Sequence, residues 1–267
     1  MGHPEEEVRI APLREWREFE RCVELQLAVW GYSDGDLIPK RVFIVAERIG
    51  GQVLGAFDTA KGDAGDAIVG FAMSFPGYCE GRAYMHSHML AVLPEYRNAG
   101  LARRLKLAQR EDALARGIDR MEWTFDPLEI KNAHLNIARL GAIARRYRRD
   151  FYGPSTSPLQ GGLPTDRLVA EWWLRSERVT RLLGGEAMGP VDIVEKIAVP
   201  AAVYQWKRDA EERKLAEALQ TRNRMALESA FAHGLAVTGY SRSAGGDGCF
   251  LIGPVSGLEE QGVGSRE

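Results

Sequence analysis

Cysteine is scarce in this sequence. Cys22, Cys79 and Cys249 are odd in number and far apart, so they predict neither a disulfide framework nor a CxxC zinc motif. Such sparse use suits a reducing, cytoplasmic compartment. Long apolar runs are missing as well: without a stretch of about 18 apolar residues, no transmembrane helix is expected. The start MGHPEEEVRI is polar and acidic and does not resemble a secretory signal. Without a long apolar run or a CxxC motif, neither a membrane partner nor a bound metal is expected.

Charge is nearly balanced over the whole chain but uneven along it. The 267 residues carry 35 basic and 37 acidic side chains. Residues 97–149 hold 13 of the basic and 6 of the acidic ones, a net charge of +7, whereas the remainder is at −9. A basic segment in an acidic chain indicates either a local anion site or a solvated basic face. A pI near 6.3 and the lack of a nucleic-acid motif argue against nucleic acid as a partner.

The hydrophobic pattern predicts a sheet with helices rather than a bundle or a sandwich. The expected strands are 8–13, 53–59, 67–74, 84–92, 121–125, 167–174, 191–199, 235–240 and 249–252. The expected helices are 16–30, 39–49, 101–116, 133–140 and one within 207–233. On the strand 167–174, Trp172 or Trp173 is expected in the core or in an interface. The order of elements is that of an α/β or α+β protein.

A short loop after the strand 84–92 leads directly into a helix. It reads Arg97-Asn98-Ala99-Gly100-Leu101-Ala102. At such a junction backbone N–H groups converge on an anion, Gly100 permits close backbone approach, and Ala102 leaves room for a ligand. Arg97, Arg103 and Arg104 add positive charge, so the loop suits a pyrophosphate. The alternative is a tight turn with glycine in a strained conformation. Neither a Walker A motif nor GxGxxG is present.

This loop resembles the acyl-CoA-binding motif of the GNAT acyltransferase superfamily. That motif has Arg or Gln, two variable residues, Gly, one variable residue, and Gly or Ala; Arg97, Gly100 and Ala102 fill its defined positions. The resemblance covers about residues 8–152 and implies a mixed, mostly antiparallel sheet flanked by helices. It divides the chain into a GNAT core over 1–152 and a C-terminal extension over 153–267. The extension is expected to complete the acceptor site, the sheet or a dimer interface.

The resemblance also implies which residues bind acetyl-CoA, or another acyl-CoA, as co-substrate. The loop amides would hold the pyrophosphate, the preceding strand would pair with the pantetheine arm, and an Asn on the downstream helix would contact the coenzyme. The implied residues are Leu90, Ala91, Val92, Arg97, Asn98, Ala99, Gly100, Leu101, Ala102, Arg103 and Asn132.

Two histidines precede the loop on the same strand. Strict alternation places Tyr84, His86, His88, Leu90 and Val92 on one face. Paired imidazoles there suit a proton path, because attack on a thioester needs a neutral amine and histidine titrates near the working pH. The strand is similar to the paired-histidine strand of arylalkylamine N-acetyltransferases, whose histidines are thought to relay the amine proton. The alternatives are a structural pair or, with a distant carboxylate, a metal site.

The family's usual tyrosine general acid is missing. Its position, four residues before Gly141, is occupied by Ile137. Tyr147 or Tyr152 would have to supply a phenol, or the thiolate leaves without an acid, since a thiol pKa is about 8.5. The run 145–149 is ambiguous. On a strand, Arg145 and Arg149 would share a face and meet the 3′-phosphate or an acidic substrate, or the run guards an edge strand.

These features together predict an N-acyltransferase that moves an acyl group, most simply acetyl, to a small-molecule primary amine. Direct transfer is expected, with no acyl-enzyme and with His86, His88 and Tyr147 as the candidate catalytic residues. One alternative is a noncatalytic acyl-CoA-binding sensor, favoured by the missing tyrosine. Another is a succinyl-CoA-type enzyme acting on amino acids. A homodimer is possible.

Overall fold

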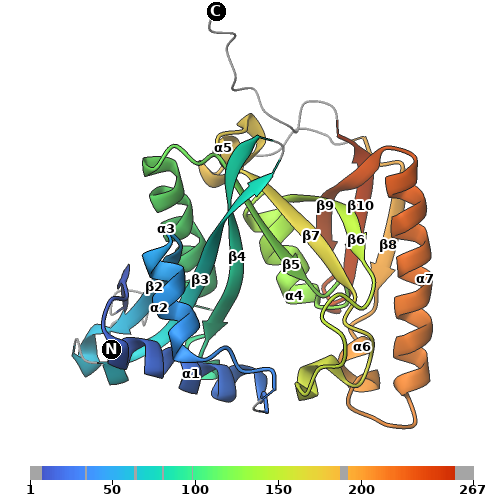
Figure 1. Cartoon of the computed structure of the whole chain (residues 1–267). Helices are drawn as coiled ribbons and strands as arrows, with labels where there is room; N and C mark the ends of the chain where they lie inside the picture. The colour runs from blue at the N-terminus through green and yellow to red at the C-terminus, as the bar shows by residue number, and fades with distance from the viewer. Residues whose placement is uncertain are drawn as a thin grey trace, which may run out of the picture. The chain divides into compact units, whose positions relative to one another are not determined.

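The computed structural model describes residues 8–33, 35–62, 65–79, 81–97, 99–186 and 192–255. The chain divides into two compact units (Figure 1). Unit 1 comprises Met1–Met121 and Thr156–Pro158, and unit 2 comprises Glu122–Ser155 and Leu159–Glu267. The boundary at residue 152, which the family resemblance implies, marks the end of the GNAT core rather than a division between compact units. It stays a prediction.

Unit 1 is built on four antiparallel strands in the order β1-β2-β3-β4. The strands are β1 (Val8–Pro12), β2 (Gln52–Asp58), β3 (Ile68–Cys79) and β4 (Arg82–Val92). Its helices are α1 (Trp16–Trp30), α2 (Lys40–Arg48) and α3 (Leu101–Ala115). All three helices were expected from the sequence: α1 from its apolar periodicity, α3 from its helix formers, and α2 and α3 from the glycines that follow them. Gly31 ends α1 in the left-handed conformation, as expected for a glycine after the last apolar position.

Two hydrophobic clusters cover the two faces of these strands. One contains residues of α1 and α2, including Phe19 and Phe43, together with Met89 of β4. The other contains Leu101 and Leu105 of α3 together with Val92 of β4. Because both faces of the sheet are covered, every residue of β2 is buried. The clusters also define two sides of β4, an α1/α2 side and an α3 side.

Unit 2 has a strand order of β5-β7-β6-β9-β10-β8. The strands are β5 (Arg120–Phe125), which begins just before the unit boundary, β6 (Ile143–Arg148), β7 (Arg167–Trp173), β8 (Glu195–Val199), β9 (Leu235–Arg242) and β10 (Gly248–Pro254). The helices are α4 (Ile130–Ala133), α5 (Glu177–Leu183), α6 (Val203–Trp206) and α7 (Arg213–Ala232). A π-helical segment, His134–Arg139, continues α4.

The C-terminal extension completes this second set of strands. β9 and β10 form the antiparallel hairpin that the sequence predicts, and β10 also pairs with β8. β9 joins β6 through Ala144 and Val237. α7 packs against β6, β9 and β8 (Figure 1). The mixed, mostly antiparallel fold expected from the sequence is confirmed. α5 and α6 were not expected, and Val191, at the start of an expected strand, lies outside the described residues.

The core of unit 2 depends on side chains from both sides of residue 152. Trp172 is fully buried, and its indole N–H donates to the Leu140 carbonyl at 2.7 Å. Phe250 and Ile252 of β10 are also fully buried. The expectation that Trp172 lies in the core is confirmed. No helix among the described residues is both long and apolar enough to cross a membrane.

Truncation at Gly185 tests how far unit 2 depends on the extension. A fragment of residues 1–185 loses β8, α7, β9 and β10, and it exposes β6 and the apolar surface that they cover. We expect aggregation, or a loss of several kcal/mol of unfolding free energy, since each buried apolar side chain contributes about 1.5–3 kcal/mol. Size-exclusion chromatography and the thermal midpoint measure this. A monodisperse fragment with the full-length midpoint would show residues 186–267 to be a separate module.

Candidate active site

The loop between β4 and α3 has the backbone of an anion cradle. Gly100 lies in the left-handed region, with φ 68° and ψ 0°, and α3 begins directly after it. The amide of Arg104 donates to the Gly100 carbonyl at 3.1 Å, so the amides of the preceding first turn have no acceptor within the helix. Glycine tolerates the left-handed conformation without strain, which explains its place here. Asn98 lies outside the described residues.

Neighbouring contacts hold the cradle in place. The Tyr96 hydroxyl bonds the Asp58 carboxylate, and Arg97 Nε donates to the Val92 carbonyl at 3.2 Å. An Arg104 guanidinium nitrogen donates to the Val8 carbonyl at 2.5 Å. Arg103 Nε is buried and has no hydrogen-bond acceptor among the described residues. The first turn of α3 carries no acidic residue, so the helix dipole and the arginines both favour an anion.

β4 contains a bulge beside the histidines. Met73 of β3 pairs with Met89, but the next residue, Ser74, pairs with Ser87. His88 is therefore the extra residue and has no partner directly opposite it on β3. In a regular strand Ser87 and Met89, two residues apart, would lie on the same side. Because of the bulge, Ser87 contacts α3, whereas Met89 packs on the α1/α2 side.

The structure brings the two histidines together and corrects the face on which they lie. The ring centroids of His86 and His88 are 6.1 Å apart. The ring of Phe75, which packs on the α1/α2 side, is 5.6 Å from the ring of His88. Leu90 and Val92 pack on the α3 side instead. The prediction that Leu90 and Val92 share a face with the histidines is wrong, because strict alternation ignores the extra residue at the bulge.

Burial sets the protonation of His88. Desolvation lowers the pKa of His88 below its ordinary value of 6.5. Its imidazole is therefore neutral at neutral pH and able to accept a proton.

The residues expected on the downstream helix lie in unit 2. Asn132 is exposed on α4, so it is free to meet a ligand. Ile137 is fully buried within the π-helical segment, which gives this position an apolar role. The part of the chain that the structure describes contains no group of three or more metal-binding side chains.

Tyr147 is engaged by a buried carboxylate. Its hydroxyl donates to Asp166 at 2.7 Å, and Arg224 bridges the same carboxylate at 3.2 Å. Burial, reinforced by the hydrogen bond to Asp166 and its charge, raises the Tyr147 pKa above its ordinary value. Tyr152 is exposed, with its hydroxyl 2.8 Å from that of Thr124. The catalytic role expected for Tyr147 stays a prediction.

Three arginines of the run 145–149, which begins on β6 and ends just after it, pair with carboxylates. A second bulge, between Ala144 and Arg146, lets Arg145 and Arg146 both contact Glu171, at 3.1 and 2.9 Å. Arg146 also contacts Glu122, and Arg149 contacts Glu228 of α7. β6 lies between β7 and β9, so the edge-strand alternative for this run is wrong, and the bulge interrupts the alternation of its side chains.

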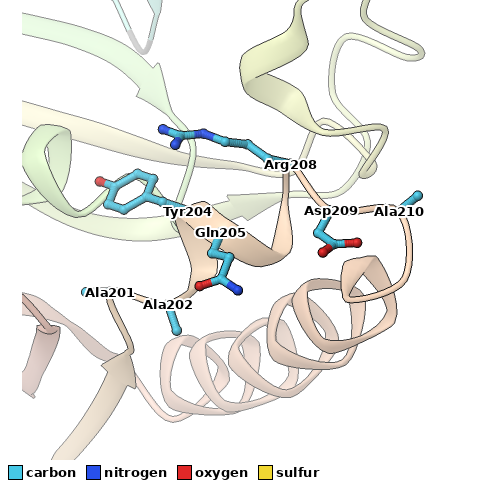
Figure 2. A pocket seen from close by; sticks show the side chains of 7 residues that line it. All are labelled: Ala201, Ala202, Tyr204, Gln205, Arg208, Asp209 and Ala210. Atoms are coloured by element: carbon cyan, nitrogen blue, oxygen red, sulfur yellow. The ribbon is translucent and has the colours of Figure 1, made fainter.

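A surface pocket of about 730 Å³ lies at α6 in unit 2 (Figure 2). Figure 2 shows the residues that line it: Ala201, Ala202, Tyr204, Gln205, Arg208, Asp209 and Ala210. None of the residues expected to bind the coenzyme is among them. The candidate site is therefore defined by the cradle and β4 rather than by this pocket.

Residues 14–139 match the model of the acetyltransferase (GNAT) family. This segment is a GNAT-family acetyltransferase domain. It contains the cradle, the histidine strand and Asn132. The GNAT resemblance of the loop is thus confirmed, whereas the further likeness to the paired-histidine enzymes stays a prediction. No curated protein shows a significant sequence match to the chain.

Three solved structures illustrate the likeness of the chain to known proteins at low sequence identity. NAA60 of Arabidopsis thaliana, in complex with a bisubstrate analogue, is 15% identical with a TM-score of 0.50, covering 62% of this chain and 97% of its own. The ribosomal-protein-S18-alanine N-acetyltransferase of Escherichia coli is 14% identical with a TM-score of 0.49, covering 70% and 99%. A GNAT acetyltransferase of Elizabethkingia anophelis with acetyl-CoA bound is 14% identical with a TM-score of 0.44, covering 62% and 98%. The first of these likenesses shows a shared fold.

Gly100→Asp and Gly100→Asn form a matched pair that tests the cradle. Asn and Asp both tolerate the left-handed conformation and have the same shape, so they differ only in charge. We expect Gly100→Asp to weaken coenzyme A binding at least about tenfold, or about 1.4 kcal/mol, and Gly100→Asn to weaken it less. Isothermal titration calorimetry measures both. Wild-type affinity in folded Gly100→Asp would exclude this loop as the anion site.

His86→Ala and His88→Ala test the proton path. If the two imidazoles act in one relay, each variant lowers kcat, and the double variant costs less than the product of the single losses. Because neutral His88 is the accepting form, activity should fall as pH falls through its pKa, which burial places below 6.5. The pH–rate profile of the wild type and of both variants measures this limb. Full activity in both alanine variants would leave the pair a structural role.

Proposed function

We propose that this GNAT acetyltransferase transfers an acetyl group from acetyl-CoA to the primary amine of a small molecule. The observation that supports this function best is the arrangement of β4 and the start of α3. Two adjacent imidazoles, one of them neutral at neutral pH, lie on the strand that leads into an anion cradle. A proton acceptor for the amine and a holder for the donor's pyrophosphate are thus carried on one continuous segment of unit 1.

In the proposed reaction, the amides at the start of α3 hold the pyrophosphate and Arg103 adds positive charge. The backbone of Leu90, Ala91 and Val92 pairs with the pantetheine arm, and Asn132 contacts the coenzyme, as the family resemblance implies. The neutral amine attacks the thioester carbonyl carbon, a C–N bond forms, and the C–S bond breaks. The amine proton passes to His88, directly or through His86 or a water molecule.

The leaving group needs no acid from the protein in this scheme. Ile137 is buried and apolar, and the phenol of Tyr147 donates to Asp166. A thiol pKa of about 8.5 makes coenzyme A thiolate a tolerable leaving group near neutral pH. Transfer is direct, because none of the three cysteines is placed by a motif beside a general base.

Thiol release from acetyl-CoA in the presence of an amine panel tests the proposal. The panel holds small primary amines, amino acids and short peptides with a free N-terminus. We expect amine-dependent thiol release with a small primary amine and a lower rate with succinyl-CoA as donor, with rates in the ordinary range of about 1–1000 per second. Acetyl-CoA binding without thiol release for every amine would overturn the transfer. Release with peptides alone would overturn the small-molecule acceptor.

A further inference from the structure

A lysine is buried directly behind the histidine strand. Lys106 lies on α3 and is only 3% exposed. Its Nζ donates to Ser87 Oγ at 2.7 Å, and Ser87 Oγ donates to Gln109 Oε1 at 3.0 Å. Lysine is almost never fully buried, because removing an ammonium group from water is costly. Burial lowers the pKa of Lys106 well below its ordinary value. An apolar residue would cost less here, so this lysine has a role other than packing.

The lysine belongs to a polar network that joins α3 to three strands. Gln52 of β2 donates through Nε2 to the Gln109 carbonyl at 2.8 Å and to Asp112 Oδ2 at 2.7 Å. Ser74 of β3 donates to Gln52 Oε1 at 2.7 Å. Ser74 and Ser87 are paired neighbours across β3 and β4. The network therefore holds both strands at the position where the bulge begins.

Ser87 is the residue through which this network acts on the histidines. In regular alternation with Met89 and Ala91, Ser87 would face the α1/α2 side. The bulge turns it to the α3 side, where its hydroxyl meets Lys106 and Gln109. His86 and His88 flank Ser87, and their rings lie close together on the other side, next to Phe75. The same bulge therefore turns Ser87 toward Lys106 on the α3 side and places the two imidazoles on the opposite side.

We propose that Lys106 is a positioning residue of the acetyltransferase site: by bonding Ser87 from α3, it holds the β4 bulge that presents His86 and His88 side by side. This inference rests on the proposed function for its effect on catalysis. Lys106 touches neither donor nor acceptor in this scheme. A slip of one residue in the pairing of β4 would turn the side chains around the bulge to the opposite side.

Lys106→Met, Ser87→Ala and the double variant test the bond. Methionine keeps the length of the side chain and removes the buried amino group, so the thermal midpoint should not fall. We expect kcat to fall about tenfold in either single variant, and the double variant to lose no more than one of them. The affinity for acetyl-CoA, measured by calorimetry, should stay within about threefold, because the cradle lies beyond the bulge. A residue with a merely structural role would not combine unchanged stability with lower kcat.

The imidazole NMR signals of His86 and His88 give a readout that does not need activity. With labelled histidine, we expect both signals to shift in Lys106→Met and in Ser87→Ala, and to stay in place in Arg110→Met, which removes a cation from the next turn of α3. Unchanged signals and unchanged kcat in folded Lys106→Met would overturn the proposal. If Lys106→Met does not fold, Ser87→Ala, which removes one oxygen atom, decides in the same way. A wild-type protein without thiol release overturns the proposed function, while the NMR signals still test the positioning.

Discussion

The extra residue in β4 is the constraint on which the rest of unit 1 depends. From Leu90 to Val92 the strand alternates between two hydrophobic clusters, which hold it against α3 on one side and against α1 and α2 on the other. At His88 that alternation is interrupted, so a serine faces α3 and two imidazoles meet on the opposite side. A regular strand with the same residues would separate the imidazoles from Phe75 and leave Lys106 without Ser87.

Whether an arginine of this protein can attract an anion depends on its partners in the fold rather than on how many basic residues surround it in the sequence. The segment 97–149 is strongly basic, yet its two halves behave differently. On β6, Arg145 and Arg146 form ion pairs with Glu171, which is 1% exposed, and Arg149, directly after β6, pairs with Glu228. At the start of α3, Arg103 Nε has no acceptor among the described residues and stands beside unpaired helix amides. We therefore expect an anion to bind at the start of α3, whereas Arg145 and Arg146 are already paired with carboxylates within unit 2.

Much of the site could be read from the sequence because its signals are local. Gly100 predicts a left-handed residue, and the helix formers after it predict the start of α3. The spacing of His86 and His88 predicts neighbouring rings, and 6.1 Å between their centroids agrees. The predictions that were wrong concern features that depend on a partner strand. Rejecting the edge-strand alternative for the arginine run required knowledge of β9, which lies about 90 residues away in sequence. Nothing in the residues around Lys106 or Ser87 marks them as buried partners.

The sequence by itself determined the antiparallel and mixed fold, the strand–loop–helix cradle, the GNAT resemblance and the hairpin of β9 and β10. Each follows from residues close together in the chain, where φ preferences and apolar spacing act directly. Only the tertiary structure decided which side of β4 carries the histidines, that the Tyr147 hydroxyl donates a hydrogen bond to Asp166, and that Lys106 lies behind the bulge. The physical reason is that a bulge or a buried hydrogen bond is set by the register between strands and by groups brought together from distant segments, and no local preference contains that register.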